Sequence, residues 1–319
     1  MAFTLDSQLA KVLAAQAEFA AASGIEFTLP ARGDALGLRA LAEGTIAPML
    51  SKADPAPDVT FTSDRALAED GTPIELRWYT KSGAAPGPAI VYVHGGGMIM
   101  GSIGDYDPLV RQYVQWTGVP QLAVEYRLAP EVKGETPARD VLAAVRWLHQ
   151  NAERLEVDPN RIAVMGDSGG GGIGAGAVIL ARDHGVPLAK QILLYPMLDD
   201  RTTDPDPDLV PYISWNYDSN FTGWYALLGD EIGTDEVSPV AAPARLGNFS
   251  GLPPAYIEVG TLDIFRDECI SYAQRLLRAG IDTDLHVLAG YPHGADWHGL
   301  QTSWKDRWKA DRVRAMTSF

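Results

Sequence analysis

The sequence predicts an α/β fold with a mostly parallel central sheet flanked by helices, and three observations support this. Short, continuous apolar runs recur along the chain, as expected for strands buried on both faces of a sheet. Segments with helical periodicity separate most of these runs, which favours crossover connections between parallel strands. The chain has 319 residues, of which 46% are hydrophobic, so it can bury the full core of one domain.

The N-terminal segment predicts two helices that precede the sheet. Apolar residues recur at helical spacing over residues 5–22, which indicates an amphipathic helix, and a second helix is expected over residues 36–50. The stretch SKADPAP at 51–57 predicts a linker. We therefore assign residues 1–52 to N-terminal cap helices and residues 53–319 to the main domain.

The sheet is expected to begin with an antiparallel pair of strands. Residues 58–63 and 73–80 alternate between polar and apolar side chains, and the Asp70-Gly71 pair between them is typical of a turn. Buried strands then follow, and their sequences are AIVYVH (89–94), QLAVEY (121–126), RIAVMG (161–166), QILLY (191–195), AYIEVG (255–260) and LHVLAG (285–290).

Two helices and one insertion are predicted between these strands. Thr136 and Pro137 favour the N-cap and first residue of a helix that runs to about Leu155. The helix after Ser168 is rich in glycine and alanine, so it can pack close to the sheet. Residues 196–253 are too long for a plain loop. We expect them to contain a helical insertion, at about 200–250, that packs with the N-terminal helices as a cap.

A candidate nucleophile follows the strand RIAVMG directly. The sequence Gly166-Asp167-Ser168-Gly169-Gly170 joins that strand to a helix, which is the context that a G-x-S-x-G nucleophile elbow requires. Such a turn strains the backbone at the serine, and the glycines let neighbouring segments approach. The alternative interpretation is a glycine-rich turn that only lets the helix pack on the sheet, and a second motif argues against it.

That second motif, His94-Gly95-Gly96-Gly97, ends an earlier buried strand. Its glycines offer backbone N–H groups without side chains in the way, and with the N–H of Gly169 they can face a carbonyl oxygen that becomes an oxyanion. A phosphate-binding loop is disfavoured, because neither a Gly-Lys-Ser/Thr nor a G-x-G-x-x-G pattern follows. His94 itself is expected to organise the loop through hydrogen bonds.

A histidine and an acid should complete such a site at the carboxyl ends of the strands. Of the six histidines, His293 lies just past the strand LHVLAG, and His298 is its rival five residues further on. The acid should follow the strand AYIEVG, which gives the chain order Ser, Asp, His. Asp263 is the first acid there, whereas Asp267 and Glu268 lie where acids ordinarily complement a helix dipole.

The motifs HGGG, YRLAPE, GDSGGG, D-x-x-R-D-E and PHG follow one another between about residues 90 and 295. In this order they resemble those of the bacterial hormone-sensitive-lipase-like (family IV) carboxylesterases of the α/β-hydrolase superfamily. The resemblance implies an α/β-hydrolase catalytic domain with a helical cap. It also implies hydrolysis of short-chain esters, roughly acetyl to octanoyl, without a metal or other cofactor, and often a homodimer.

Site residues are carried over from that family by motif. The resemblance implies that Ser168 is the nucleophile, that Asp263 and His293 complete the triad, and that Gly95, Gly96 and Gly169 form the oxyanion hole. The residues that match a supporting element of the family are Tyr126, Arg127 and Glu131.

The chain departs from the family pattern at three positions. Met98 replaces the aromatic residue that usually follows HGGG, Gly169 replaces the usual alanine, and Ala295 replaces an aromatic residue after His-Gly. We expect these changes to give a roomier pocket lined by Met98 and Met100. Two residues of the insertion are further candidates for bounding the substrate, with packing inside the cap as the alternative: Trp215 and Tyr217.

Other functions can be weighed against this one. A formal charge of −15 disfavours nucleic acid as a partner, because phosphate neutralisation needs a basic face. The start of the chain does not resemble a secretory signal, and no run is long enough for a membrane span, so a cytoplasmic protein is expected. An amidase, formamidase or lactonase with the same triad stays open, as does a receptor that binds a small ligand without turnover.

Overall fold

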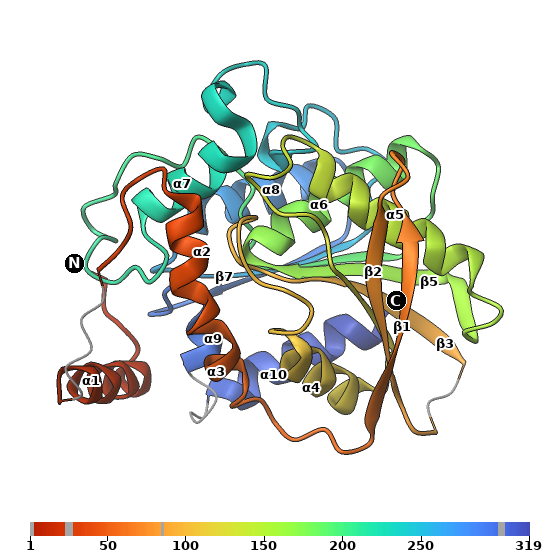
Figure 1. Cartoon of the computed structure of the whole chain (residues 1–319), viewed down its shortest axis with the longest axis horizontal. Coiled ribbons are helices and arrows are strands. Elements are labelled where there is room, and N and C mark those ends of the chain that lie inside the picture. The colour runs from red at the N-terminus through yellow and green to blue at the C-terminus, as the bar shows by residue number, and fades with distance from the viewer. Residues whose placement is uncertain (1–2, 23–27, 84–85, 299–303) are drawn as a thin grey trace.

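The computed structural model confirms an α/β fold with a mostly parallel sheet flanked by helices (Figure 1). It describes residues 3–22, 28–83, 86–298 and 304–319. Within that part of the chain the sheet has eight strands in the order β1-β2-β4-β3-β5-β6-β7-β8. Strand β2 pairs antiparallel with β1 and β4, and all other neighbours are parallel. The strands are β1 (Val59–Leu67), β2 (Pro73–Lys81), β3 (Gly87–Val93), β4 (Gln121–Val124), β5 (Val157–Asp167), β6 (Lys190–Leu194), β7 (Ala255–Gly260) and β8 (Thr283–Leu288).

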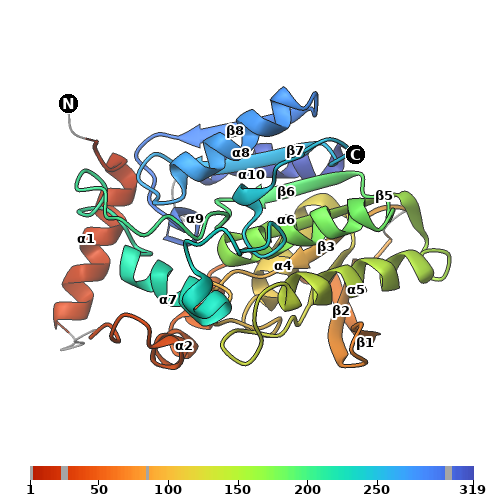
Figure 2. The ribbon, with the colours of Figure 1, turned by 90° about the horizontal axis from the view of Figure 1, so that it is seen from above.

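Helices cover both faces of this sheet. Figures 1 and 2 show α5, α6 and α8 on one face and α4 and α10 on the other. The strands between them are buried on both faces, which explains their continuous apolar sequences. Outside residues 1–50 and the long segment before β7, the described helices are α4 (Asp107–Thr117), α5 (Thr136–Gln150), α6 (Ser168–Asp183), α8 (Arg266–Arg278), α9 (Ala295–His298) and α10 (Trp304–Thr317).

The predicted antiparallel pair is present, and its first strand is longer than expected. β1 continues to Leu67, where it pairs with Pro73 of β2. The turn between them uses the Asp70-Gly71 pair as predicted. The Asp70 carboxylate accepts the N–H of Thr72 at 2.9 Å, and Gly71 has a φ of +82°, a conformation that favours glycine.

Two helix predictions were wrong in detail. The helix expected over 36–50 is two helices, α2 (Ala35–Glu43) and α3 (Ile46–Leu50), because the chain turns at the residues between them. Helix α5 ends at Gln150, and Thr136 is its first residue, not its N-cap. Position 135 takes the cap place without a side-chain cap hydrogen bond, and Pro137 lies in the first turn as predicted.

The first helix, α1 (Ser7–Ala22), begins where Asp6 caps it. The Asp6 carboxylate accepts the N–H groups of Gln8 and Leu9, at 2.9 and 3.1 Å, which fixes the start of the helix. Leu9 is buried, and it packs in a small cluster with Leu288 and Tyr291 at the end of β8. This contact attaches α1 to the edge of the sheet where the loop after β8 begins.

The long segment before β7 carries a helix that contacts the N-terminal part of the chain. It contains α7 (Tyr217–Leu228) and two short 3-10 helices, Gly229–Glu231 and Pro243–Arg245. The N–H of Gly33, just before α2, donates to Thr222 Oγ1 at 2.8 Å. Arg32 forms an exposed ion pair with Asp218 at 2.7 Å. These contacts place α2 beside α7, as Figure 1 shows.

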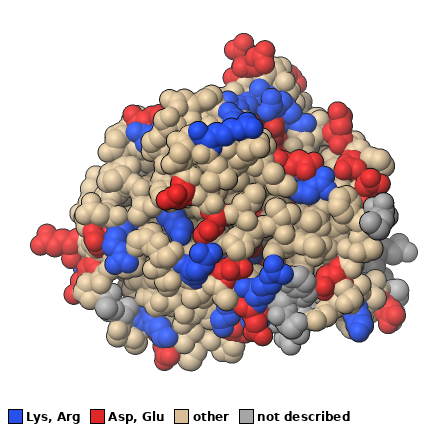
Figure 3. Space-filling model, turned by 180° about the vertical axis from the view of Figure 1, so that it is seen from behind, with Lys and Arg blue, Asp and Glu red and all other residues tan. Residues whose placement is uncertain are grey.

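The surface carries charges of both signs. On the face shown in Figure 3, acidic and basic side chains are interspersed, so the excess of acids forms no single patch there. Among the helices of the described residues, none combines the length and the hydropathy that a membrane crossing needs.

Candidate active site

The nucleophile candidate lies at the junction of β5 and α6. Ser168 begins α6 with a φ of +54°, a strained value for a serine that is typical of a nucleophile elbow. The glycines around it are required by close backbone contacts. A Cβ atom on Gly166 would lie 2.4 Å from the carbonyl oxygen of Gly170, and one on Gly170 would lie 2.1 Å from that of His94. Larger residues would push the turn apart.

The structure brings the three predicted triad residues together. Ser168 Oγ lies 2.8 Å from His293 Nε2, and His293 Nδ1 lies 2.8 Å from Asp263 Oδ2. Asp263 is fully buried, and its other oxygen accepts the N–H of Phe265 at 2.9 Å. The carboxylate is therefore held on both oxygens, and one of them is aimed at the imidazole.

The loops that carry these residues leave the carboxyl ends of neighbouring strands. Strands β5, β6, β7 and β8 lie side by side and parallel, so their C-terminal loops meet at one edge of the sheet. Ser168 follows β5, Asp263 follows β7 and His293 follows β8. The side chain of His298, the rival base, lies outside the described residues. Asp267 instead pairs with its neighbour Arg266 at the surface.

The glycines of the loop after β3 differ in their position relative to the cavity. Gly96 and Gly97 line the cavity that contains Ser168, whereas Gly95 does not. A Cβ atom on Gly95 would lie 2.4 Å from Asp167 Oδ2, so Gly95 is packed behind the nucleophile. The backbone conformation explains this difference. Gly96 and Gly97 have positive φ values, +113° and +57°, which favour glycine and turn the chain toward the cavity.

Gly169 faces this loop from the start of α6. A Cβ atom on Gly169 would lie 2.8 Å from the backbone nitrogen of Gly97 and 2.7 Å from that of Met98. The absence of a side chain here lets the two segments approach closely, which accounts for glycine at a position where the resembling family has alanine. Backbone amides of both segments therefore gather beside Ser168.

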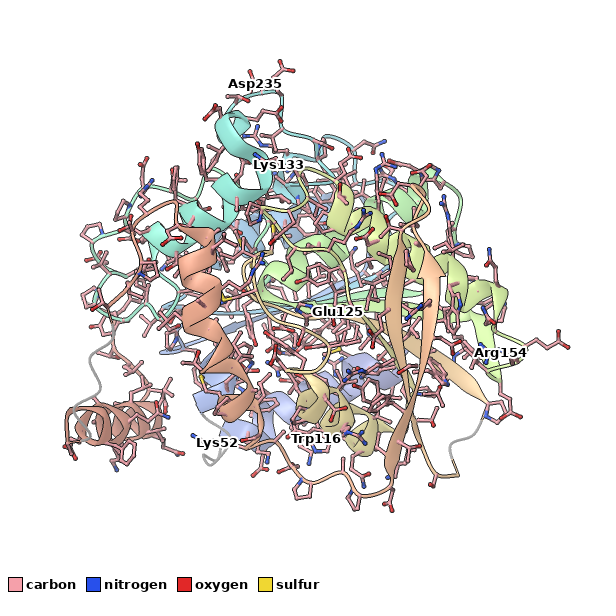
Figure 4. All side chains as sticks on the ribbon, viewed as in Figure 1. Lys52, Trp116, Glu125, Lys133, Arg154 and Asp235 are labelled. Carbon is pink, nitrogen blue, oxygen red and sulfur yellow. The ribbon has the colours of Figure 1, made fainter. Side chains whose placement is uncertain are left out.

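Buried polar groups support the glycine loop from below. His94 Nδ1 lies 2.8 Å from the carbonyl oxygen of Gly95, and Tyr126 donates its hydroxyl to the carbonyl of His94 at 2.8 Å. Burial lowers the pKa of His94 to about 4, so its ring is neutral at pH 7. Glu125, labelled near the centre of Figure 4, accepts the N–H of Ile103 at 2.8 Å. His94 and Tyr126 thus have structural contacts, as predicted.

The N-terminal helix α2 is fixed to the end of the same loop by one arginine. Arg39 donates from Nε to the carbonyl of Ile99 at 2.6 Å and from Nη2 to that of Ala129 at 2.8 Å. Its guanidinium also forms a two-pronged pair with Glu131, which belongs to the YRLAPE motif. The motif is therefore an anchor for the helix that covers the site.

An apolar cavity of about 300 Å³ opens above Ser168 and His293. Of the four residues predicted to line the pocket, Met100 and Trp215 line this cavity, whereas Met98 and Tyr217 do not. Met98 has a φ of +67°, which turns its side chain into the core toward Gly172. Tyr217 is buried beside Asp206. The lining residues are Leu29, Leu38, Leu41, Ala42, Thr45, Ile46, Met49, Gly96, Gly97, Met100, Ser168, Tyr195, Ser214, Trp215, Ser219, His293, Gly294 and Trp297.

Ser214 and Trp215, in the segment before α7, contact the loop of His293 and the glycine loop. The Ser214 hydroxyl donates to the carbonyl of His293 at 2.6 Å. The Trp215 ring lies so close over the glycine loop that a Cβ atom on Gly97 would be 2.6 Å from it. The indole N–H points to Asn220 Oδ1 at 3.3 Å, and Asn220 is fully buried on α7. No motif or spacing in the sequence indicates a role for Ser214 or Asn220.

A buried carboxyl lies directly behind the nucleophile. Asp167 accepts the hydroxyl of Tyr92 at 2.6 Å, and it is almost inaccessible to solvent. Burial raises the pKa of Asp167 to about 7, although the Tyr92 bond acts in the opposite direction. Within the described part of the chain, no three His, Cys, Asp or Glu side chains come together in a group that could hold a metal ion.

Comparisons with known proteins show which hydrolases this chain is similar to. A family model described as alpha/beta hydrolase fold matches residues 90–296. The esterase LipI of Mycobacterium tuberculosis is 36% identical over 240 residues, which cover 72% of this chain and 73% of LipI. The ethyl acetate hydrolase of Pseudomonas putida is 33% identical, with 72% and 74% covered.

Among solved structures, a bacterial heroin esterase superposes with a TM-score of 0.86 at 34% identity, over 98% of this chain and 97% of that one. An esterase from Pyrobaculum calidifontis superposes with a TM-score of 0.84 at 28% identity, over 99% of both chains. The family match covers more than half of the chain, and it includes the loops of Ser168, Asp263 and His293. The chain therefore belongs to the hormone-sensitive-lipase-like (family IV) esterases of the α/β-hydrolase superfamily.

Proposed function

We propose that this chain, a carboxylic ester hydrolase acting on small-molecule esters, works through an acyl-enzyme on Ser168. The observation that carries the proposal is the hydrogen-bonded chain from Ser168 through His293 to Asp263 at the base of an apolar cavity. A receptor without turnover has no need of such a chain. The amidase and lactonase alternatives use the same groups, and nothing in the site favours them over an esterase.

In the proposed mechanism, Ser168 Oγ attacks the carbonyl carbon while His293 Nε2 accepts the hydroxyl proton. Asp263 accepts a hydrogen bond from Nδ1–H and stabilises the imidazolium that forms. The bond to the ester oxygen then breaks, and the alcohol leaves with the proton from His293. Water then loses a proton to the same ring and attacks the carbonyl carbon of the acyl-enzyme. The bond to Ser168 Oγ breaks, His293 returns the proton to Oγ, and the acid leaves.

The oxyanion formed in each step is assigned to the backbone N–H groups of Gly96, Gly97 and Gly169. Gly97 replaces Gly95 in this assignment, because it lines the cavity and its nitrogen faces Gly169. Fixed N–H donors lower the barrier because they require no reorganisation when the negative charge develops. The N-terminus of α6 adds a favourable dipole at the same place.

The size and lining of the cavity support short-chain esters as substrates. A cavity of about 300 Å³ with mostly apolar walls has room for a short acyl chain and a small alcohol. We propose a preference in the range of roughly acetyl to octanoyl esters. One relative is named for its action on ethyl acetate, an ester within this range.

The proposal is tested by hydrolysis of p-nitrophenyl esters from acetate to laurate, by the native chain and by Ser168→Ala. Activity that peaks at short acyl chains and disappears in Ser168→Ala supports it. Failure of the folded native chain to hydrolyse any of these esters contradicts it, and so does full activity of Ser168→Ala.

The organisation of the protein adds three parts to the proposal. Helices α2 and α7 act as a cap over a catalytic domain that spans residues 53–319, which is supported by their mutual contacts above the cavity. We also propose that two chains form a homodimer, because the edge strand β8 is partly exposed and can pair with a second copy. Light scattering tests this. The protein is cytoplasmic, a location that suits its free Cys269 thiol and that cell fractionation tests.

A further inference from the structure

Two aromatic side chains flank the imidazole of His293. The rings of Tyr195 and Phe265 lie nearly perpendicular to it, with centroids 4.9 and 5.0 Å away. Ser168 and Asp263 contact its two nitrogens. The orientation of the base therefore depends on the aromatic neighbours as well as on the acid.

Tyr195 is held in an unusual position. Its φ of +37° is strained for a bulky residue, and such a conformation persists only where the surroundings impose it. Its N–H donates to the carbonyl of Glu258 at 2.6 Å. Its hydroxyl donates to the carboxylate of Asp296, at 3.0 Å from one oxygen and 3.2 Å from the other.

Packing alone does not fix this ring. A cavity of about 20 Å³, which is room for about one water molecule, lies beside Tyr195, Asp296 and Arg312. On the side of this cavity the ring has no close apolar packing, so a directional bond is needed to fix its position. The hydroxyl bond to Asp296 is the directional bond on that side.

Asp296 is itself fixed by a buried arginine from α10. Arg312 is 1% exposed, and its guanidinium donates to Asp296 Oδ2 at 2.8 Å. The same guanidinium pairs with Glu258 and donates to the hydroxyl of Tyr113. Buried charge clusters of this kind contribute little net stability compared with apolar packing, so their placement points to a positional role.

We propose that Tyr195, Asp296 and Arg312 form a second support that positions the imidazole of His293, separate from Asp263. Arg312 fixes the Asp296 carboxylate, Asp296 fixes the Tyr195 hydroxyl, and the Tyr195 ring restrains His293. All three are positioning residues, because neither Asp296 nor Arg312 lines the substrate cavity and the Tyr195 hydroxyl is turned away from it. The inference rests on the proposed role of His293 as the base.

The chain offers a matched control in Tyr256. Its hydroxyl donates to Glu258 at 2.6 Å, so it binds the other carboxylate of the same arginine cluster, and it is also buried. Its ring contacts His286 and not His293. Tyr256→Phe therefore removes the same kind of bond from the same cluster without touching the base.

The experiment compares kcat, KM and Tm of Tyr195→Phe and Tyr256→Phe on p-nitrophenyl butyrate. Loss of one hydrogen bond that orients the base is expected to lower kcat of Tyr195→Phe about tenfold, with KM within about twofold. Tyr256→Phe should keep the native kcat. Its Tm should fall by about as much as the Tm of Tyr195→Phe. Asp296→Asn keeps the shape of the side chain and should lower kcat less than Tyr195→Phe.

A second readout separates positioning from product release. The rate at which diethyl p-nitrophenyl phosphate inactivates Ser168 requires the same base but a single turnover, so it should fall by the same factor in Tyr195→Phe. An unchanged kcat in Tyr195→Phe overturns the inference, and so does an equal loss in Tyr256→Phe. An inert native chain would instead contradict the proposed function.

Discussion

The floor and the roof of the cavity are built on different principles. The floor consists of Gly96, Gly97, Ser168 and His293, with Asp263 buried behind the histidine. These residues sit on loops at one edge of the sheet and are fixed by hydrogen bonds and close backbone contacts. The roof consists of helices α2 and α3 with residues 214–219, and its contacts with the cavity are mostly apolar. Hydrogen bonds fix the positions of individual atoms, whereas apolar packing fixes only the shape and size of the cavity. Substitutions in the floor should therefore change kcat, and substitutions in the roof should change KM and the preferred acyl chain.

The largest effect is expected from the acid of the floor. Asp263→Asn should lower kcat about 10⁴-fold without unfolding the protein, because the amide no longer holds the imidazole in the required tautomer. The matched control is Asp267→Asn, four residues further on, whose native carboxylate pairs with Arg266 at the surface. Steady-state kinetics and circular dichroism check both variants. A loss of the same size in Asp267→Asn instead would show that the acid is misassigned.

The next effect concerns the glycine loop of the floor. Gly97→Ala should lower kcat about 10²- to 10³-fold, because the added methyl group meets Trp215 and displaces an oxyanion donor. Gly118→Ala is the control, since Gly118 has a similar φ of +69° but open space around its Cβ position, at the end of α4. Both variants carry the same kind of backbone strain. Equal kinetics in the two would mean that the Gly97 amide is not a donor.

A substitution in the roof should change KM more than kcat. Trp215→Ala removes a wall of the cavity, so the KM for butyrate esters should rise about tenfold and the preferred acyl chain should lengthen. Tyr217→Phe lies two residues away, outside the cavity, and should leave the chain-length profile unchanged. The measurement is kcat/KM across the p-nitrophenyl series. A large fall in kcat without a change in acyl-chain preference would mean that Trp215 supports the catalytic groups and does not bound the substrate.

The smallest effect on turnover is expected from Asp167, which lies behind Ser168 and should make the stability depend on pH. Asp167 has a raised pKa of about 7, so between about pH 4 and 7 the folded state keeps a proton that the unfolded state loses. The free energy of unfolding should therefore fall as pH rises through this range. Asp167→Asn should abolish this fall, which totals on the order of 1–3 kcal/mol between about pH 4 and 7, as measured by urea unfolding at several pH values. An unchanged slope would show that Asp167 is ionised throughout.

The floor was largely predictable from the sequence because its chemistry is local. Ser168 sits in a strand-turn-helix context, and His293 follows the last strand directly, so residue type and position sufficed to select them. The choice among the glycines was not predictable in this way. Gly95 and Gly97 have the same side chain, and only the backbone angles decide which amide faces the cavity.

The roof was predicted only as a helical insertion. Trp215 and Tyr217 are equally apolar and two residues apart, yet one lines the cavity and the other is buried outside it. Met98 follows the glycine loop directly, but its left-handed backbone turns the side chain into the core. The contact of Tyr195 with Asp296 joins residues 101 positions apart, so no local pattern indicates it.

The most direct test of the account is covalent trapping of the nucleophile. The native chain is incubated with diethyl p-nitrophenyl phosphate, and the product is examined by intact mass and peptide mapping. The account predicts a single diethylphosphoryl group on Ser168, equimolar release of p-nitrophenol, loss of esterase activity, and no adduct in Ser168→Ala. An unmodified native chain that stays folded, or an adduct on another residue that abolishes activity, would contradict it.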